Sequence, residues 1–564
     1  MNWVKRRPEC KTIKDVVLAN TGLSEEEFLH PKSEFRIDRL DEAADMIRTF
    51  VSENKSITIV GDYDADGICA SSILYLAIKA LGVEPVVRLP RRFSEGYGLS
   101  EKIVDEIPEG LLITVDNGIA AVDAIQKAKD KGLTVLLTDH HLPLESGEIP
   151  NADIVIDPNA IENSADFNSY CGAGIAYKLA IKLIGENHKF SPKLLSMAAI
   201  ATIADVMPLI SENRLIVKKG LESMVGYAGR TTGLGALLKA CDMDKFITEK
   251  NIAFKIAPIL NAPGRMYDDG AMMSFDLLTF NSRIDVAEGK ATDLIDINEE
   301  RKEAKAAGLE KLHQNIDDNC LMGDYPLCIY EPCLPEGLVG IFAGSLAEEF
   351  KVPCFVFTDA DEKGVIKGSG RTYGDVHLKE LLDANSSLLL KYGGHAEAAG
   401  VSLLAENFEA MKEAFAATVI VPDTSDTDIV YYDLEVSENN IAATIEALKE
   451  FAPFGQGNPE IVFRINDYML SPGYGGYYRT MGSDGQTIKF FGSELEAVGF
   501  GMLQKYLDLK EPKILNFVGM LSINFFRGVA KSQIELLDFN DANKEIKKTS
   551  FANLLAKKAE TRYK

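Results

Sequence analysis

Three aspartates at alternate positions form the segment of this sequence best suited to chemistry. The segment Gly61-Asp62-Tyr63-Asp64-Ala65-Asp66-Gly67 directly follows the apolar run SITIVG. Alternate side chains of an extended backbone point to one side, so these carboxylates would repel one another unless a cation neutralised them. Oxygen ligands suit hard divalent cations such as Mg²⁺ and Mn²⁺. The structural alternative is an Asx-rich turn with Asp66 as the N-cap of the next helix. A calcium-binding EF-hand loop is excluded, because Ile73 stands where that loop needs a glutamate.

Two further apolar runs also end in groups that bind metals. LLITVDNG places Asp116 just beyond 111–115, and TVLLTDHH places Asp139, His140 and His141 just beyond 134–138. Ligands and catalytic groups of open parallel sheets gather at the carboxyl ends of the strands. Each residue alone could be a surface turn or a solvated polar group. Their coincidence at three strand ends predicts one catalytic metal site.

A fourth kind of acidic position lies inside an apolar helical run. Asp205 interrupts AAIATIADVMPL, and a charged group in such a run needs a partner or a metal. A helix cap before Pro208 is the alternative. We therefore add Asp205 to the candidate metal ligands.

These residues need elements that position them, and the chain divides into seven segments. Apolar strands alternate with helical stretches from about 56 to 157, which predicts a parallel sheet covered on both faces. A second α/β pattern follows a long charged helix, and short strands separated by Gly, Asn, Asp and Pro turns predict a small β-barrel. The segments are a helical lead-in (1–54), a first α/β domain (55–284), a connecting helix (285–318), a second α/β domain (319–420), a connector (421–459), the barrel (460–540) and a basic tail (541–564).

Composition limits the class of protein. The chain has 564 residues, is 46% hydrophobic and carries a net charge of −25. The apolar content excludes a disordered or fibrous chain, and the charge argues against a whole-surface polyanion binder. No run of about 20 apolar residues could span a bilayer, and MNWVKRRPEC is not followed by an apolar signal core. We expect a cytoplasmic protein. Its eight cysteines form no CxxC pair, so a zinc ribbon is not expected.

The motifs together resemble a known family. GDYDADG, VDNG, TDHH and ADVMPL, in that order, are similar to the DHH phosphoesterase superfamily and, within it, to the RecJ family of single-strand-specific 5′→3′ DNA exonucleases. RFSEGYGL, CGAGIAYKLA and APILNAPGRM extend the resemblance, GSGRT with GGHAEAAGVSL resembles a DHHA1 domain, and FGQGNPEIVF resembles the entry to an OB-fold. The fold class this implies is α/β: a parallel-sheet DHH domain, a long connecting helix, a second α/β DHHA1 domain, then a β-barrel OB-like domain.

The resemblance implies two divalent cations, Mn²⁺ or Mg²⁺, at the acidic cluster. Asp116 would bridge them as a ligand. The other implied ligands, whose division between the two metals stays open, are Asp62, Asp64, Asp66, His140 and Asp205. His141 would orient His140 or contact the scissile phosphate, and Asp139 would support them. The expected catalytic residues are the six implied metal ligands together with His141. Two such cations can activate a water and stabilise the leaving oxygen of an in-line phosphodiester displacement.

An exonuclease must also sense a strand end. Arginine forks bind phosphate with two hydrogen bonds, and four positions match the family's 5′-phosphate pocket: Arg92, Arg265, Ser369 and Arg371. Each arginine alone could instead be solvated or structurally ion-paired. His395 follows a Gly-Gly pair where the backbone could approach phosphate closely, or where it merely turns tightly.

The barrel would bind single-stranded DNA through stacking and charge. The candidate aromatic residues are Tyr474, Tyr477, Tyr478, Phe490, Phe491, Phe525 and Phe526, interleaved with Arg479, Lys489 and Arg527. Most of these aromatics must form core, so we expect two or three at most to stack on bases. The basic tail could add phosphate contacts or be disordered.

Three functions from different classes fit this outline. The first is a single-stranded-DNA exonuclease that releases 5′-mononucleotides in DNA repair and recombination, with a single-strand-binding protein and a helicase as implied collaborators. The second is a DHH-family phosphodiesterase acting on nanoRNA or cyclic dinucleotides, but such enzymes usually lack an OB-like module. The third is a non-enzymatic relative that only binds DNA, but such relatives lose metal ligands, and here each expected acid and histidine is present. We favour the exonuclease.

Overall fold

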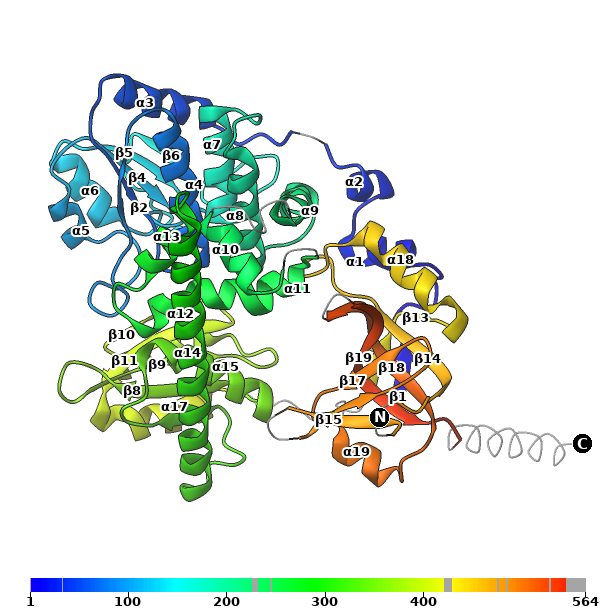
Figure 1. Cartoon of the computed structure of the whole chain (residues 1–564). Helices are drawn as coiled ribbons and strands as arrows, with labels where there is room; N and C mark the ends of the chain where they lie inside the picture. Colours follow the sequence, from blue (N-terminus) through cyan, green and yellow to red (C-terminus); the bar gives the residue numbers. More distant parts are fainter. Residues whose placement is uncertain are drawn as a thin grey trace, which may run out of the picture. The chain divides into compact units, whose positions relative to one another are not determined.

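The protein folds into two compact units in the computed structural model (Figure 1). The structure describes residues 2–32, 34–225, 232–243, 246–419, 429–473, 476–482, 485–526 and 529–543. The larger unit comprises Phe35–Asp205 and Lys219–Asp423. The smaller unit comprises Met1–Glu34, Val206–Lys218 and Thr424–Lys564. None of the described helices is long and apolar enough to cross a membrane.

The first sheet of the larger unit is five-stranded and fully parallel, as expected. Its order is β3-β2-β4-β5-β6, with β2 (Ile57–Val60), β3 (Val86–Arg88), β4 (Leu111–Val115), β5 (Thr134–Thr138) and β6 (Ile154–Ile156). β2, the first strand of this sheet along the chain, has β3 on one side and β4 on the other, so the strand order reverses there. In open parallel sheets the carboxyl ends of strands at such a reversal form the ligand-binding crevice.

Helices cover both faces of this sheet because its strands are apolar on both sides. Residues of α5 (Glu101–Glu106) and α6 (Val122–Asp130) share one core with β4 and β5. α3 (Leu40–Ser52), α4 (Ala65–Ala80) and α7 (Gly172–Ile184) lie on the other face (Figure 1). The starts of α4 and α7 therefore reach the same edge as the ends of β2 and β4.

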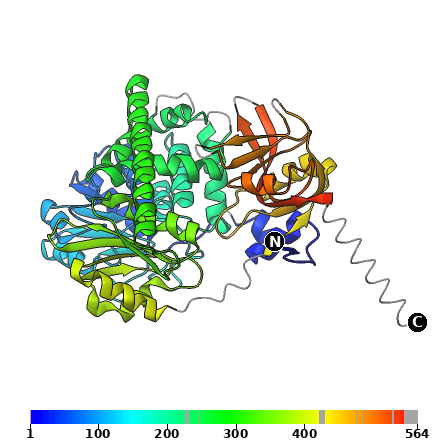
Figure 2. The same ribbon diagram turned by 90° about the horizontal axis from the view of Figure 1, so that it is seen from below.

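A helical region follows and leads into one long helix. It contains α8 (Ser191–Ala204), α9 (Ser211–Val225), α10 (Gly233–Ala240), α11 (Glu249–Asn251), a π-helical turn (Ile252–Ile256), α12 (Ala257–Met266) and α13 (Ala271–Thr279). The long helix α14 (Ile284–Asp318) is unbroken in both views (Figure 1 and Figure 2). The sequence suggests an exposed helix, but one face is buried along its length, including Ala291, Leu294, Leu312 and Ile316. Its first half packs against α10, α12 and α13, and its second half packs against α15 and β7.

The second sheet of the larger unit is mixed. Its order is β10-β11-β9-β8-β7, with β7 (Leu327–Tyr330), β8 (Cys354–Asp359), β9 (Val365–Arg371), β10 (Lys391–Gly394) and β11 (Ala398–Leu404). Only β7 and β8 pair in parallel; the other neighbours are antiparallel. Its helices are α15 (Val339–Phe350), α16 (Leu378–Ala384) and α17 (Phe408–Thr418). This arrangement agrees with the expected second α/β domain.

The smaller unit is built on a seven-stranded sheet of order β13-β14-β18-β19-β17-β16-β15. Its strands are β13 (Leu434–Glu435), β14 (Val462–Met469), β15 (Tyr478–Met481), β16 (Thr487–Phe490), β17 (Glu496–Gly499), β18 (Ile514–Phe526) and β19 (Val529–Asp541), with helices α18 (Ile441–Phe451) and α19 (Leu503–Asp508). Residues 544–564 of the expected basic tail lie outside the described residues.

The beginning of the chain is mostly helical, as expected, but it opens with a strand. β1 (Asn2–Lys5) is a strand and pairs in parallel with β12 (Ile429–Tyr432). α1 (Ile13–Thr21) and α2 (Glu25–Leu29) contribute to the core of the smaller unit. Such pairing across more than 400 residues leaves no local signal, which is why a reading of nearby sequence misses it.

A short internal segment also groups with the smaller unit. The sequence analysis placed Val206–Lys218 within one domain of 55–284, but it belongs to the smaller unit. Arg214, within this segment, donates hydrogen bonds to the carbonyl oxygens of Glu450, Phe451 and Ala452 at the end of α18. These carbonyls have no partner inside the helix, so the buried guanidinium satisfies them.

Candidate metal-dependent active site

The acidic segment after β2 is extended only as far as Asp64. α4 begins at Ala65, and Asp64 is its N-cap, with its carboxylate accepting the backbone N–H of Asp66 and Gly67 at 3.0 and 3.1 Å. The expectation of Asp66 as N-cap is therefore wrong. Asp66 instead lies in the first turn of α4, where the positive end of the helix dipole stabilises a carboxylate. Gly67 permits this tight start, since a Cβ there would lie 2.5 Å from the backbone nitrogen of Asp62.

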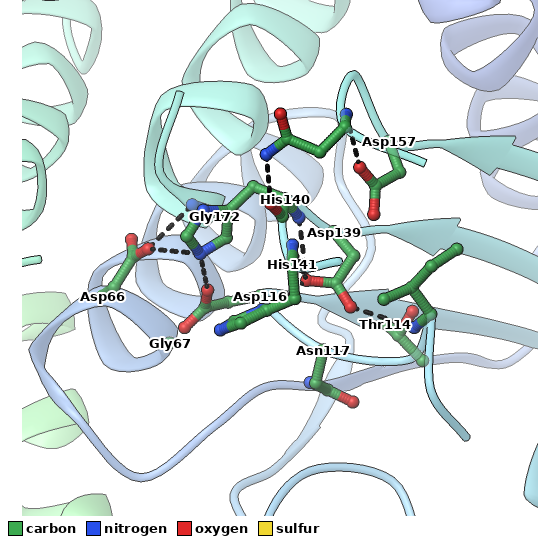
Figure 3. Close-up of polar contacts among 12 residues, drawn as sticks. Asp66, Gly67, Thr114, Asp116, Asn117, Asp139, His140, His141, Asp157 and Gly172 are labelled. Atoms are coloured by element: carbon green, nitrogen blue, oxygen red, sulfur yellow. Dashed lines mark hydrogen bonds and ion pairs between the residues drawn. The ribbon is translucent and has the colours of Figure 1, made fainter. Parts of the chain in front are cut away.

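Asp66 is held by the first turn of α7. Its two carboxylate oxygens accept the backbone N–H groups of Gly172 and Ala173, each at 2.7 Å (Figure 3). These N–H groups have no partner within their own helix, so they are free to bind an anion. Gly172 also packs against Asp116: a Cβ on Gly172 would lie 2.4 Å from the Asp116 Cβ.

Asp116 and His140 meet at the centre of the site. Asp116 follows β4 with a φ of 62° and is 2% exposed, while His140 follows β5 and is 6% exposed. His140 Nε2 lies 3.0 Å from Asp116 Oδ1, 3.6 Å from Asp66 Oδ2 and 3.7 Å from Asp205 Oδ2. Figure 3 shows this imidazole directed at both Asp66 and Asp116.

Asp139 orients the histidine pair. Its carboxylate accepts the backbone N–H of His140 at 2.8 Å and lies 2.7 Å from His141 Nδ1. The other oxygen accepts the backbone N–H of Ile119 at 2.9 Å. Although burial opposes it, these hydrogen bonds hold the pKa of Asp139 below its usual range. Burial likewise opposes the charged form of His141, but the bond to Asp139 and nearby carboxylates raise its pKa to about 9.

Asp205 is both a helix cap and a member of the acidic cluster. It is the C-cap of α8, and its side chain also reaches the cluster. Burial and the charges of Asp66 and Asp64 raise its pKa to about 8. A carboxylate at the negative end of a helix is unfavourable unless a cation compensates it.

The electrostatics and the unsatisfied atoms of the cluster fit a metal-binding site. Burial and repulsion from neighbouring carboxylates raise the pKa of Asp62, Asp64 and Asp116. Among the described residues, Asp62 Oδ1, Asp116 Oδ1 and His140 Nε2 are buried without a hydrogen-bond partner. Buried polar atoms normally have partners, so these atoms fit metal coordination.

The donor atoms form three overlapping groups, each with its atoms within 4.8 Å of one another. The groups are Asp62, Asp64 and Asp116; Asp66, His140 and Asp205; and Asp116, His140 and His141. Carboxylates with one or two imidazoles suit Mn²⁺ or Mg²⁺. The tertiary structure thus brings together all seven positions expected at this centre.

Comparisons with known proteins match this architecture. Three family models match the chain. They are "DHH family, N-terminal domain" over residues 56–202, "DHHA1 domain" over 327–420 and "RecJ OB domain" over 432–538. The chain is 33% identical, over 75% of its own length and 77% of the relative, to the single-stranded-DNA-specific exonuclease RecJ of Dickeya dadantii. The chain belongs to the RecJ family. The predicted fold class and family resemblance are thereby confirmed.

Two solved RecJ structures contain divalent cations. Two structures of RecJ from Thermus thermophilus, in complex with Mn²⁺ and with Mg²⁺, superpose with TM-scores of 0.77 and 0.70. Both are 25% identical to this chain in sequence. Each match covers 96% of this chain and, respectively, 79% and 78% of the Thermus protein. Divalent cations are therefore cofactors of this RecJ-family fold, and the acidic cluster has the donor set to hold them.

The residues predicted to bind a 5′-phosphate lie beside the acidic cluster, since the charge of Arg92 acts on Asp62 and that of Asp64 acts on Arg265. Ser369 Oγ accepts a hydrogen bond from Arg371 Nη1 at 2.8 Å and donates to the Ala399 carbonyl at 3.1 Å. Arg92 lies over the ring of Tyr63, 4.5 Å from its centroid. Burial and repulsion from Arg92 lower the pKa of Arg371.

Arg265 joins the same pocket. Burial and the charge of Arg92 lower its pKa to about 10, with Arg371 contributing in the same direction. Gly337, just before α15, packs closely against the backbone of Arg265. A Cβ on Gly337 would lie 2.0 Å from the Arg265 carbonyl oxygen. The RecJ fold thus gathers the three predicted arginines and Ser369.

His395 lies in the hairpin turn between β10 and β11. It is exposed, and its backbone N–H donates to the Ala398 carbonyl at 2.9 Å. Gly394 has a φ of 134°, a conformation that requires glycine. The tight-turn interpretation of the glycine pair therefore describes this segment, and a contact of His395 with DNA stays a prediction.

The OB domain uses many of its aromatic residues as core. Phe490 is 1% exposed, and Tyr477 and Tyr478 pack against the same core. Lys489 is ion-paired with Glu496, which removes it from the candidate phosphate contacts. Tyr474 and Arg527, and the side chains of Phe525 and Phe526, lie outside the described residues.

Sequence reasoning missed two residues of this centre. The Tyr97 hydroxyl donates to the Asp116 carbonyl at 3.1 Å and lies 3.2 Å from His141 Nε2; it sits in RFSEGYGL, a motif quoted without a role for it. Asp157 directly follows β6, so the rule for parallel strand ends could have found it. Burial and the charge of Asp139 raise the pKa of Asp157 to about 7.

Proposed function

We propose that this chain is a metal-dependent exonuclease that degrades single-stranded DNA from the 5′ end and releases 5′-mononucleotides. The observation that carries the proposal is the juxtaposition, in a RecJ-family chain, of a carboxylate–imidazole cluster with an arginine pocket. The cluster suits hydrolysis of a phosphodiester, and the pocket suits a terminal phosphate.

Two divalent cations fit the overlapping donor groups. Asp62 and Asp64 would hold one cation, Asp66, His140 and Asp205 the other, and Asp116 would bridge both. When bound, such a pair activates water and stabilises the leaving oxygen of an in-line displacement. Mn²⁺ and Mg²⁺ both suit this donor set.

The chain's own residues prepare the site for the substrate. Asp139 fixes the ring of His141 through Nδ1, and we assign His141 to contact with the scissile phosphate. The first turn of α7 holds Asp66 in place through two backbone N–H groups. Because these contacts exist before substrate binds, little reorganisation is needed during the reaction.

End recognition gives the reaction its direction. Arg92, Arg265, Ser369 and Arg371 would bind the 5′-phosphate, with the turn at His395 approaching the backbone nearby. Guanidinium groups bind phosphate oxygens in pairs, which suits a terminal phosphate with three free oxygens. A strand anchored by this end presents its first phosphodiester to the metal centre.

The OB domain supports single-stranded DNA as the substrate, since OB-folds bind single strands through stacking and charge. It also disfavours a phosphodiesterase for nanoRNA or cyclic dinucleotides. We further propose that the protein acts in DNA repair and recombination in the cytoplasm, with a single-strand-binding protein and a helicase supplying its substrate.

The test is product analysis on a 30-nucleotide strand labelled at either end. With Mn²⁺ or Mg²⁺, a 5′ label should appear at once as mononucleotide, whereas a 3′ label should shorten progressively. Blunt duplex DNA and chelator should both abolish release. Cleavage restricted to dinucleotides, or mononucleotide release first from the 3′ label, would contradict the proposal.

A further inference from the structure

A fourth arginine, on the long helix α14, stands beside the phosphate pocket. The Tyr267 hydroxyl, just after α12, donates to Glu300 Oε2 at 3.0 Å and so ties the end of α12 to α14. Arg265 lies in the last turn of α12, and Arg301 directly follows Glu300. The two helices run side by side here (Figure 1).

Arg301 is tethered by one edge only. Its Nε donates to Asn298 Oδ1 at 3.1 Å, and Asn298 is 4% exposed. In the part of the chain that the structure describes, its two terminal nitrogens have no hydrogen bond or ion pair. That leaves the fork of the guanidinium, the edge that binds phosphate, unused.

Among the described residues, the neighbouring acids form no ion pair with Arg301. Glu299 pairs with Lys302 at 2.8 Å, and Glu300 accepts the Tyr267 hydroxyl. A chain with a net charge of −25 has many carboxylates available. In the described ranges none of them forms an ion pair with Arg301, and only the charge of Glu299 acts on it, so the fork of its guanidinium is open to another anion.

The other arginines of the group likewise lack a paired carboxylate among the described residues. Besides burial, the charges of Arg92, Arg301 and Arg371 lower the pKa of Arg265 while Asp64 opposes them, so three guanidinium groups lie within electrostatic reach of Arg265. No carboxylate forms an ion pair with any of the four in the described ranges. Like charges gathered in partly buried positions destabilise a fold unless an anion binds them.

We propose that Arg301 is a specificity-determining residue that helps this pocket distinguish a terminal phosphomonoester from a hydroxyl end. A terminal phosphomonoester carries a charge of about −1.5 to −2 near pH 7, and a phosphodiester carries about −1. A group of four arginines matches the larger charge. This inference rests on the proposed function and adds Arg301 to the residues expected there.

The backbone of α15 completes the pocket near Arg371. A Cβ on Gly340 would lie 2.9 Å from Arg371 Nη2 and 3.2 Å from Ser369 Oγ. Gly340 is in the first turn of α15, so the positive end of that helix faces the same group of arginines.

The experiment compares Arg301→Gln with Lys311→Gln, which removes the same charge from an exposed residue further along α14. The rate kcat/KM is measured on single strands with a 5′-phosphate or a 5′-hydroxyl. Binding of the same two strands is measured by fluorescence anisotropy in chelator, where no hydrolysis occurs. We expect Arg301→Gln to lower the phosphate-to-hydroxyl ratio about tenfold in both assays, since one charge-assisted hydrogen bond is lost. Lys311→Gln should keep the wild-type ratio.

Arg301→Lys separates charge from geometry. It keeps the positive charge but loses the fork, so its ratio should lie between the wild type and Arg301→Gln. An equal loss on both ends, with an unchanged ratio, would assign Arg301 a structural role and overturn the inference. A wild-type ratio in Arg301→Gln, alongside a reduced ratio in Arg371→Ala, would overturn it while leaving the pocket intact. A wild-type enzyme without any end preference would instead contradict the proposed 5′-phosphate pocket itself.

Discussion

His140 Nε2 and Asp116 Oδ1 face one another at 3.0 Å, yet neither atom makes a hydrogen bond. Both residues are almost fully buried. Such an arrangement is unfavourable in isolation and would become favourable if both atoms coordinated a cation. The folded chain is therefore organised for a metal before the metal arrives.

Asp116→Asn should separate metal binding from folding. The amide keeps the shape of the side chain but removes a buried charge that neighbouring carboxylates repel. We expect nuclease activity to fall more than ~100-fold, because loss of a ligand exceeds the about 10–100-fold effect of losing a supporting contact. The midpoint of thermal unfolding in chelator should stay unchanged or rise. Near-normal turnover would contradict the assignment of Asp116 as a ligand.

Gly172→Ala should disturb the same residue through packing alone. An added Cβ would lie 2.4 Å from the Asp116 Cβ and 2.6 Å from Oδ1, so Asp116 or the start of α7 must shift. Mn²⁺ affinity, measured by isothermal titration calorimetry, should drop about 10–100-fold. Gly174→Ala, two residues further along α7, is the matched control, since its Cβ would make only ordinary contacts of 3.5 Å or more. Equal affinities in the two variants would rule out this packing effect.

Tyr97→Phe should lower kcat by about 10-fold with little change in KM. The hydroxyl supports both the Asp116 backbone and the His141 ring, and loss of such support costs about 10–100-fold. Steady-state kinetics on a 5′-phosphorylated strand provides the measurement. Tyr63→Phe is the control, because its ring packs edge-on against Tyr97 but its hydroxyl has no hydrogen bond among the described residues. If both variants lost the same activity, the effect would belong to the aromatic packing.

Lys193→Met should stabilise the larger unit in a pH-dependent way. Lys193 is 2% exposed, with Asn281 Oδ1 as its hydrogen-bond partner at 2.7 Å, and burial lowers its pKa to about 7. Between that pKa and the ordinary value of 10.5, the unfolded chain binds more protons than the folded one, so wild-type stability rises with pH. The methionine variant lacks this dependence. Its advantage, roughly 2–4 °C in the unfolding midpoint for each kcal/mol gained, should be largest near pH 7 or below and shrink toward pH 10. Lys189→Met, at an exposed position, should show no such trend.

Much of the larger unit's first sheet follows from sequence alone, because buried parallel strands are continuous apolar runs. The runs at 111–115 and 134–138 coincide with β4 and β5. Since parallel strands end at one edge, Asp116, His140 and His141 could be placed together without any coordinates. A charge inside the apolar run AAIATIADVMPL singled out Asp205, and the family motifs added the arginines, which no local pattern would have selected.

Contacts between distant segments were decided only by the tertiary structure. The N–H groups that hold Asp66 come from a helix that begins more than 100 residues later, and β1 pairs with a strand near the other end of the chain. Arg301 reads in sequence as one charge among many on an exposed helix, and only the packing of α14 beside α12 places it near Arg265. The sequence determined which residues could bind metal and phosphate, since that depends on side-chain chemistry and local periodicity. Which of them share one site, and which charges lack a counter-ion, depends on packing between segments far apart in the chain.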